Sequence, residues 1–343
     1  MSERFPAMPC IALGMAAALA SAQALADEDT KIGARIFADF TSIDAKSDGI
    51  KTDTSGMGVD VKRAYVIVEH KFDDVWSANV TTDFQYASND SVTQVYIKKA
   101  YVQAKLSDAF VVRAGSADLP WVPLMENLYG HLFLEKVIVD RLKFGTSADW
   151  GLNVYGKPGE MFNYSVSLVN GGGYKNPTRT KTMDVEGRVA FTPIDGLSVI
   201  AGLYSGKRGL KTDGGAATPN TANRVDAAVT YVKSGLRLGA EYFTAKNWNN
   251  VTGATVDDKA DGFSVWGSYD FAPQWGVFAR ADKAKLSKDV NPGREDRYFN
   301  LGVVSHPRNN IDVALAYKND KVSGGTGAVT KYGEVGVWAQ VAF

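Results

Sequence analysis

Residues 76–86 read WSANVTTDFQY, and apolar or aromatic side chains alternate in this stretch with polar ones. Val80 and Phe84 occupy one phase of the two-residue repeat, whereas Asn79 and Asp83 occupy the other. Successive side chains of a β-strand point to opposite faces, so this period predicts a strand with one apolar face and one polar face.

The same alternation recurs along the chain after residue 30 and defines sixteen segments. They begin near Lys31, Asp60, Trp76, Val95, Ala109, Ala148, Met161, Met183, Leu197, Arg224, Leu236, Gly262, Trp275, Arg297, Ile311 and Tyr332. Short turns such as residues 234–235 (SG) alternate with long polar loops such as residues 171–182. This alternation of short and long connections is typical of a transmembrane barrel.

The alternative to a barrel is a soluble β-sandwich, in which every apolar face must meet another apolar face. Sixteen strands are too many for one such sandwich. Aromatic residues also gather at strand ends, as in the girdles of membrane barrels, at Trp76, Tyr86, Trp150, Phe162, Phe191, Phe271 and Trp275. Because a sheet in lipid must close on itself, we predict an all-β protein. It is a transmembrane antiparallel β-barrel of about sixteen strands, one domain over residues 27–343, in the bacterial outer membrane.

The N-terminus has the order of a secretory signal peptide. Arg4 precedes an apolar run over residues 11–20, and the small-residue motif at residues 24–26 (ALA) follows. The run is shorter than the ~20 residues needed to span a bilayer. We expect residues 1–26 to be the signal peptide, with cleavage after Ala26. The only cysteine, Cys10, lies inside it, so the mature chain has no disulfide.

Composition and motifs argue against several other functions. The 38 basic and 38 acidic residues cancel, so no overall field attracts nucleic acid. The sequence contains no glycine-rich phosphate loop and no haem-attachment motif. His131, near Glu126 and Glu135, is the only histidine with conceivable chemistry, and its spacing from Glu135 equally suits an ordinary helical polar face. We therefore expect no enzyme activity, no cofactor, no metal site and no nucleic-acid partner.

Three features together resemble a known family. Residues 62–66 (KRAYV) are echoed by residues 98–102 (KKAYV), a long insert at residues 118–146 follows the fifth segment, and the last segment, residues 332–343, ends in Phe343. This plan resembles the sixteen-stranded bacterial porins, especially the phosphate-selective porin O and P family. The resemblance covers the mature chain and implies a homotrimer in outer-membrane lipid that passes small ions and polar solutes. Members of that family hold phosphate with an arginine ladder and a lysine cluster.

The insert, residues 118–146, differs from the other loops because it is largely apolar and carries scattered charges. Its charged or titratable residues include Glu126, His131, Glu135 and Arg141. An exposed loop of this apolarity would favour aggregation. We expect it to fold inward and narrow the lumen, as the third loop of porins does. The alternative is an outward loop that packs against a neighbouring subunit.

The polar strand faces should line the lumen, because Arg or Lys on the lipid face costs roughly 2–4 kcal/mol at the midplane. The basic residues expected there are Arg63, Lys99, Arg113, Lys157, Arg188, Arg237 and Arg280. The acidic ones are Glu69, Asp83, Glu186, Asp226 and Glu241. Arg63, Lys99 and Arg113 could form a basic column resembling the family's arginine ladder. The plainer interpretation is a wall of mutual ion pairs.

We therefore predict a porin for passive diffusion of small hydrophilic solutes, weakly selective and slightly anionic or phosphate-preferring. A sealed structural or adhesin-like barrel, which binds partners through its long loops, is the alternative. The many inward polar residues and the 34 glycines favour a wet lumen, since a sealed barrel fills its interior with bulky side chains.

Overall fold

The computed structural model describes residues 29–86, 93–177, 179, 182–210, 220–248 and 256–343. The predicted signal peptide, residues 1–26, lies outside the described residues. Among the helices of the described part, none has the length and apolarity needed to cross a membrane.

In this part of the chain, sixteen long antiparallel strands and one two-residue strand, β2 (Ile50–Lys51), form a single sheet. The long strands are β1 (Thr30–Ser47), β3 (Gly56–Lys71), β4 (Trp76–Tyr86), β5 (Thr93–Ser107), β6 (Phe110–Asp118), β7 (Ala148–Gly156), β8 (Phe162–Val169), β9 (Asp184–Ile194), β10 (Leu197–Gly206), β11 (Ala222–Lys233), β12 (Leu236–Lys246), β13 (Lys259–Ala272), β14 (Trp275–Ser287), β15 (Arg294–Arg308), β16 (Ile311–Ser323) and β17 (Thr330–Ala342). The predicted sixteen-stranded barrel is therefore confirmed. The largest error in a strand start is at β3, which begins at Gly56 rather than Asp60.

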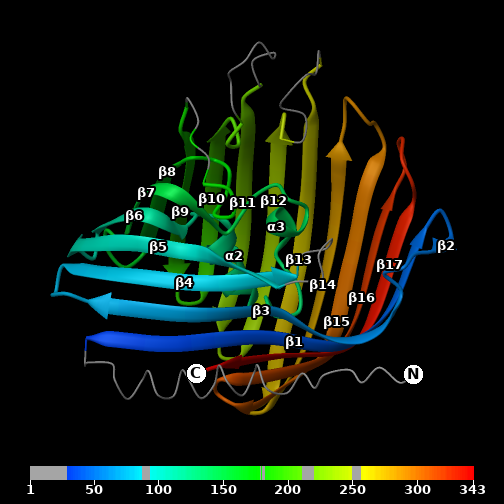
Figure 1. The fold of residues 1–343 in the computed structure, drawn as a ribbon, viewed down its shortest axis with the longest axis horizontal. Coiled ribbons are helices and arrows are strands. Elements are labelled where there is room, and N and C mark those ends of the chain that lie inside the picture. Colours follow the sequence, from blue (N-terminus) through cyan, green and yellow to red (C-terminus); the bar gives the residue numbers. More distant parts are fainter. Residues whose placement is uncertain (1–28, 87–92, 178, 180–181, 211–219, 249–255) are drawn as a thin grey trace, which may run out of the picture.

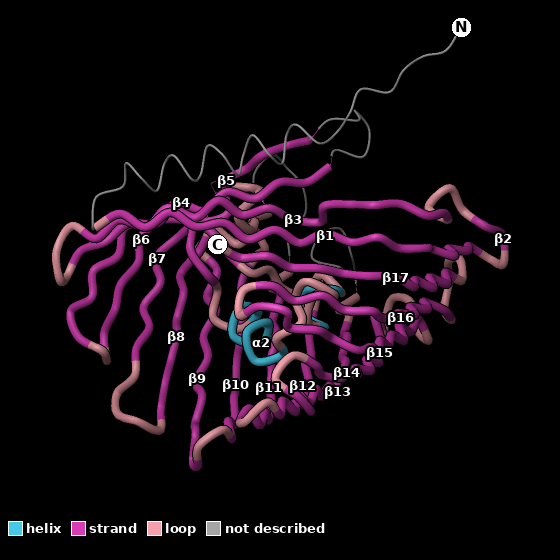
Figure 2. The backbone as a smooth tube through the Cα atoms, turned by 90° about the horizontal axis from the view of Figure 1, so that it is seen from below, coloured by secondary structure: helices cyan, strands magenta, loops and turns pink. Residues whose placement is uncertain are grey.

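The sheet closes because its first strand pairs with both β3 and β17 (Figures 1 and 2). The β1–β17 ladder runs from Arg35 opposite Ala342 to Ser47 opposite Thr330. The terminal residue extends it, since Phe343 exchanges backbone hydrogen bonds of 2.7 and 3.0 Å with Ala34. No long strand is left as an edge, which is what a lipid environment requires of a sheet.

Polar and apolar side chains are distributed in the reverse of the way they are in a soluble protein, with charges buried and aliphatic side chains exposed. In β11, Arg224 and Asp226 are buried on the inner face, whereas Val225 and Val229 are exposed on the outer face. Other strands of the barrel follow the same rule. The outward faces of the strands are therefore apolar, as in a transmembrane barrel, and the inner faces carry the polar side chains.

Two β-bulges alter this alternation in the strands that carry the repeated motif. The register of β3 with β1 shifts at Lys62, which has no residue directly opposite it. The register of β5 with β4 shifts in the same way at Lys98. A bulge adds one residue and re-aims the chain. Each bulge thus turns two adjacent basic side chains to the inner face. These are Lys62 and Arg63 in β3, and Lys98 and Lys99 in β5.

The insert contains helices α2 (Val122–Tyr129) and α3 (Ile138–Arg141). Pro123 lies in the first turn of α2, where its missing N–H costs nothing, and Gly130 ends the helix with φ 80°. Figures 1 and 2 show both helices within the curve of the sheet. The buried insert side chains, Trp121, Val122, Met125, Tyr129, Val137, Ile138, Val139 and Phe144, form a core with residues of β9–β13 such as Ile200, Phe243 and Trp266.

A charge on the outer face should therefore destabilise the barrel. Val265 lies on the exposed face of β13 between Ala240 and Ala281. We expect Val265→Arg to lower the free energy of unfolding in lipid vesicles by about 2–4 kcal/mol. The control is Val290→Arg, at an exposed position in the turn after β14. Equal stability of the two variants in denaturant titrations would contradict a lipid-facing Val265.

Candidate functional site

Arginines of the barrel wall hold the insert by its backbone. Each donates to a backbone carbonyl oxygen of the insert. The bonds run from Arg188 Nε to Pro120 (2.7 Å), from Arg237 Nη1 to Leu128 (3.0 Å), from Arg280 Nη1 to Lys136 (2.6 Å) and from Arg224 to Phe144. Hydrogen bonds from charged donors are stronger than neutral ones. Four strands thus fix the insert along most of its length.

Trp121, at the start of α2, is held by two buried carboxylates. Its backbone N–H donates to Glu186 (2.9 Å) and its Nε1–H donates to Glu241 (2.7 Å). Arg224 neutralises this region through Asp226 (2.9 Å) and Glu186 (3.4 Å). The expected inner-wall residues Glu186, Asp226 and Glu241 are therefore brought together, and what they contact is the insert.

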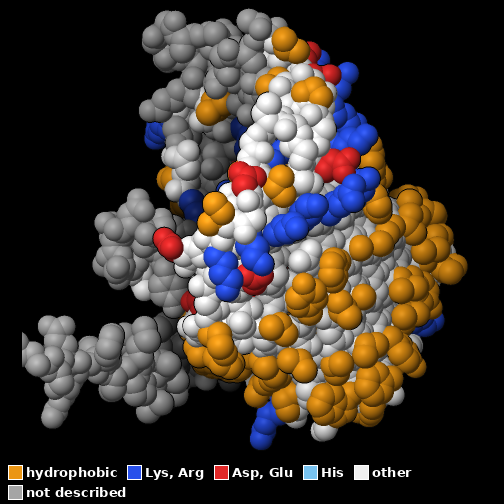
Figure 3. All heavy atoms as spheres, turned by 90° about the vertical axis from the view of Figure 1, so that its right-hand side faces the viewer, with side chains coloured by type: hydrophobic (Ala, Val, Ile, Leu, Met, Phe, Trp, Pro, Cys, Tyr) orange, Lys and Arg blue, Asp and Glu red, His pale blue; other side chains and the backbone are white. Residues whose placement is uncertain are grey.

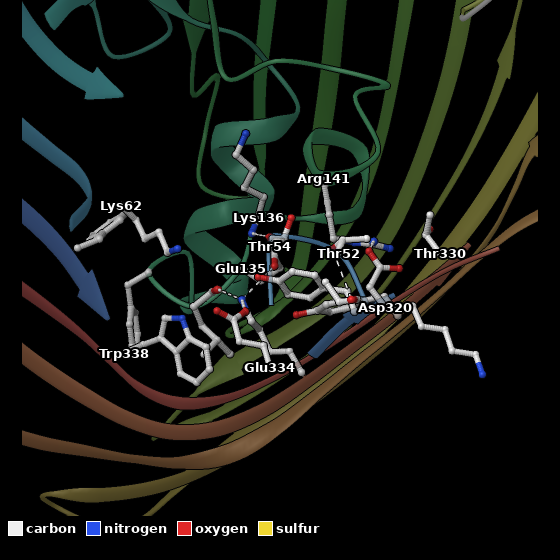
Figure 4. A pocket seen from close by; sticks show the side chains of 18 of the residues that line it. Thr52, Thr54, Lys62, Glu135, Lys136, Arg141, Asp320, Thr330, Glu334 and Trp338 are labelled. Carbon is white, nitrogen blue, oxygen red and sulfur yellow. Dashed lines mark hydrogen bonds and ion pairs between the residues drawn. The ribbon is translucent and has the colours of Figure 1, made fainter. Parts of the chain in front are cut away.

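Arg141 at the end of α3 lies among three carboxylates of the opposite wall, one of which, Asp320, is seen beside it in Figure 4. Its guanidinium is 3.2 Å from Asp282, 2.5 Å from Asp296 and 3.0 Å from Asp320, and it packs 4.4 Å from the Tyr298 ring centroid. A single cation therefore cross-links three neighbouring strands to the insert.

A second ion-pair cluster holds the preceding turn of the insert. Lys318 Nζ lies 3.4 Å from Glu135 and 2.7 Å from Glu334, above the Trp338 ring. Figure 4 shows Glu135 and Glu334 directed toward the same point. Glu135 is thus paired with the wall.

The other two insert residues singled out from the sequence, His131 and Glu126, are buried. The His131 ring packs 4.7 Å from that of Phe278, and burial lowers the pKa of His131 to about 4, so the ring is neutral at pH 7. Burial raises the pKa of Glu126 to about 7, against the opposing effect of Lys98. Within the described residues, no group of three or more His, Cys, Asp or Glu side chains is arranged to hold a metal ion.

Two of the cavities beside the insert have volumes of about 650 and 720 Å³. Leu132 and Phe133 line both, so this stretch of the insert separates them. Figure 4 shows the first cavity, with Lys62, Lys136 and Trp338 among its lining side chains. The second, which we call the basic cavity, is lined by Lys98, Lys99, Arg113 and Arg237 and by carboxylates on the other strands.

Four cations that line the basic cavity have no carboxylate at ion-pair distance in the described part of the chain, namely Arg35, Lys98, Arg113 and Arg237. Tyrosine rings hold two of them. The Arg113 guanidinium lies between the rings of Tyr101 (4.6 Å) and Tyr155 (4.5 Å) and donates to Gln103. The Lys98 ammonium donates to the Tyr65 hydroxyl (3.2 Å). Cation–π contacts and neutral hydrogen bonds orient both groups without cancelling their charge.

The other predicted lining residues differ in their partners. Arg63 lies 3.7 Å from Asp83, and Lys99 lies 2.6 Å from Asp118. Two of the three residues of the expected basic column are therefore ion-paired. Glu69 lines the basic cavity and accepts from Asn79. Lys157 is not brought to these groups, because β7 ends before it and it lies in an exposed turn.

Sequence reasoning missed several inner residues. Lys98 was missed because strict alternation points it toward lipid, and the bulge reverses this. Arg224 has the same phase as Asp226 and could have been found from the period alone. The three carboxylates around Arg141 share the inward phase, but their convergence depends on how the insert packs.

A closed barrel of sixteen long strands, apolar outside and charged within, has the architecture of a porin. The chain belongs to the phosphate-selective porin O and P family, whose model matches residues 30–211, more than half of the sequence. It is accordingly an outer-membrane channel protein rather than an enzyme.

Solved structures share this fold at low sequence identity. The outer-membrane channel DcaP of Acinetobacter baumannii is 13% identical, with a TM-score of 0.67 over 92% of this chain and 97% of that one. The anion-selective porin from Comamonas acidovorans is 15% identical, with a TM-score of 0.64 over 92% and 99%. A trimer form of OmpT from Vibrio cholerae is 14% identical, with a TM-score of 0.57 over 92% and 99%. No curated protein sequence matches the chain.

Removal of the Arg141 side-chain charge should leave three buried or half-buried carboxylates without their shared cation. We expect Arg141→Gln to lower the free energy of unfolding by about 3–5 kcal/mol, the usual effect of breaking a buried ion pair from one side. Lys143→Gln, at an exposed insert position, is the control. Unfolding in urea, followed by the gel shift of the folded barrel, measures both. An unchanged midpoint for Arg141→Gln would contradict its role as an anchor.

Proposed function

We propose that this porin passes small hydrophilic solutes by passive diffusion through a channel that the insert narrows, with a slight preference for anions such as phosphate. The observation that carries the proposal is the group of cations without a carboxylate partner at the basic cavity, of which Lys98 and Arg113 are held by tyrosine rings. Arg237 donates to the insert backbone, and most other inner charges are held in ion pairs. Lys98 and Arg113, together with Arg35, are therefore the cations left to act on a passing ion.

The role of the insert follows from where it is fixed. Its anchors are on β9, β11, β12 and β14–β16, so it fills the lumen on that side. Both cavities are lined by β1 and β3 and by β15–β17, and β5 lines the basic cavity. Lys62 projects into the first cavity and Lys98 into the basic one. A solute that crosses the barrel would therefore pass between the insert, at Leu132 and Phe133, and the basic strands opposite.

Several features favour weak anion preference over strong selectivity. Arg113 keeps a positive guanidinium beside a water-accessible cavity, and arginine offers several donors that match phosphate geometry. Lys99 adds a further cation that Asp118 partly neutralises. On the opposite side, Asp270 and Asp312 lie near His306, which is 2.6 Å from Asp312. A transverse field of this kind orients water and small ions without excluding one sign.

We further propose a homotrimer embedded in outer-membrane lipid. The described outer face of the barrel is apolar, and a structure with the same fold, OmpT of Vibrio cholerae, is described as a trimer form. Three identical pores would then close in three equal current steps.

Planar-bilayer recordings of the refolded mature chain test the proposal. We expect stepwise conductance in threes, a reversal potential of anionic sign in a salt gradient, and a current that phosphate reduces. In Lys98→Gln/Arg113→Gln the phosphate block should weaken about tenfold, because two charged hydrogen-bond donors are lost. Lys157→Gln, in an exposed turn, is the control.

Three results would contradict parts of this proposal. Unchanged phosphate block in the double variant would remove Lys98 and Arg113 as the binding groups. Strong cation preference of the wild-type channel would exclude the anionic preference. A folded, heat-modifiable barrel with no conductance would instead support a sealed barrel that binds partners through its loops.

The anion preference should also depend on pH through Glu126. Because burial raises the pKa of this carboxyl to about 7, it is mostly neutral at pH 6 and mostly ionised at pH 8. Ionisation adds a negative charge beside Lys98, so the anionic reversal potential should shrink as the pH rises between these values. Glu126→Gln should hold the low-pH value throughout. A pH profile that is the same in wild type and Glu126→Gln would contradict this assignment.

A further inference from the structure

A continuous row of basic side chains crosses five neighbouring strands on the outer face of the barrel. The residues stand directly opposite one another in the register, one per strand on β14, β15, β16, β17 and β1. The pairs are Lys283 with Arg297, Arg297 with Lys321, Lys321 with Lys331, and Lys331 with Lys46. We call these five residues the outer basic row. None of them lines the basic cavity, whereas Lys46 and Lys331 also line the first cavity at its edge.

Such a row opposes folding unless something negative accompanies it. Directly opposite side chains on adjacent strands have Cβ atoms roughly 5 Å apart, and like charges in that position are destabilising. Glu295 lies 3.0 Å from Arg297 and 3.9 Å from Lys283. At the other end, Asp44 lies 2.8 Å from Lys46. These two carboxylates relieve only the ends of the row.

The centre of the row is not neutralised within the described residues. Neither Lys321 on β16 nor Lys331 on β17 has a carboxylate at ion-pair distance there. The nearest outward neighbours along their strands are uncharged, namely Asn319, Ser323 and Gly333. Two adjacent lysines therefore present their charge outward with no partner from the same chain.

The height of the row on the barrel is that of a membrane interface. Directly below it on the outer face lie the aromatic pair Phe299 and Tyr317, with ring centroids 5.7 Å apart, and then exposed Leu301 and Leu315. Figure 3, which shows the side of β15–β17, has a stripe of Lys and Arg above a band of hydrophobic side chains. Aromatic residues at such a boundary mark the level of lipid headgroups.

The row lies at the end of the strands that carries the long loops. Lys283 is four residues before the end of β14, and Arg297 is three residues after the start of β15. At the opposite end, β13 and β14 join through a tight turn between Ala272 and Trp275. In outer-membrane barrels the longer loops are extracellular, so the row faces the headgroups of the outer leaflet.

We propose that the outer basic row binds the phosphate groups of an anionic, phosphate-bearing lipid of the outer leaflet. Long basic side chains reach from the apolar band to the interface. Each contributes on the order of fivefold to binding at an anionic membrane surface. Phosphates at the height of Lys321 and Lys331 would relieve the like-charge contact that the register imposes.

Charge complementarity favours a lipid over a second copy of the chain as the occupant. The carboxylates near this height on the described outer face are Asp44, Glu295 and Asp261. All three already pair with Lys or Arg of the same copy. A neighbouring subunit would therefore bring little negative charge to Lys321 and Lys331, whereas a bilayer of phosphorylated lipid would bring much.

The test uses the full folded barrel in nanodiscs of zwitterionic lipid, titrated with bis-phosphorylated lipid A or with the same lipid without its phosphates. We expect Lys321→Gln/Lys331→Gln to lose at least tenfold in affinity for the phosphorylated lipid, because two cations are removed. Affinity for the dephosphorylated lipid should be weak and unchanged. Lys71→Gln/Lys105→Gln is the control, since it removes the same charge at the short-turn end.

Heat-modifiability on gels and single-channel conductance confirm that each variant is folded, and neither should change in Lys321→Gln/Lys331→Gln. Equal affinity of this variant and the wild type for phosphorylated lipid would overturn the proposal. So would an equal loss in the control, which would indicate only net charge. If the variant instead changed the oligomeric state in lipid-free detergent, the row would be a contact between copies and the lipid assignment would be wrong.

Discussion

The hydrogen bonds that join β1 to β17 are the constraint on which the rest of the structure depends. A strand edge exposed to lipid would leave a row of N–H and C=O groups unpaired, each at a cost of several kcal/mol. The ladder from Arg35 to Ser47, extended by Phe343 against Ala34, removes that edge. Once the sheet is closed, alternate side chains must face either lipid or the lumen. The exposed valines and buried charges of β11 follow directly from this division.

A lumen lined with charges then determines how the insert is held. Arginines of the wall donate to backbone carbonyl oxygens of the insert, as Arg237 does to Leu128 in the last turn of α2 and Arg280 does to Lys136 before α3. Arg141 reverses the arrangement, with the cation on the insert and the carboxylates on the wall. Many charged residues that the sequence predicted to line the pore thus join the insert to the barrel wall. Such pairs fix geometry more than they add net stability.

The fold could be predicted from the sequence because a strand in a barrel must alternate with a period of two. Each of the sixteen long strands starts within four residues of its predicted position, and only the two-residue β2 was not predicted. The site could be predicted only in part. Phase alone places Arg113 and Glu241 on the inner face, but it says nothing of their partners, which lie far along the chain. Lys157 has the phase of an inward residue but does not line the lumen, because β7 ends one residue earlier and Lys157 lies in the exposed turn that follows.

Lys98 shows which feature of the sequence could have predicted its inward orientation. Two adjacent basic residues in a membrane strand cannot both face the lumen under strict alternation, and one of them would then face lipid at roughly 2–4 kcal/mol. That conflict is resolved by a bulge, and the structure has one at Lys62 and another at Lys98. A repeated basic pair inside a predicted membrane strand therefore predicts a bulge. The same argument explains why the outer basic row lies near the strand ends, where the interface supplies water and headgroups. Where a charge is tolerated in this barrel depends on which surroundings can compensate it: a carboxylate, a tyrosine ring beside water, or a lipid phosphate.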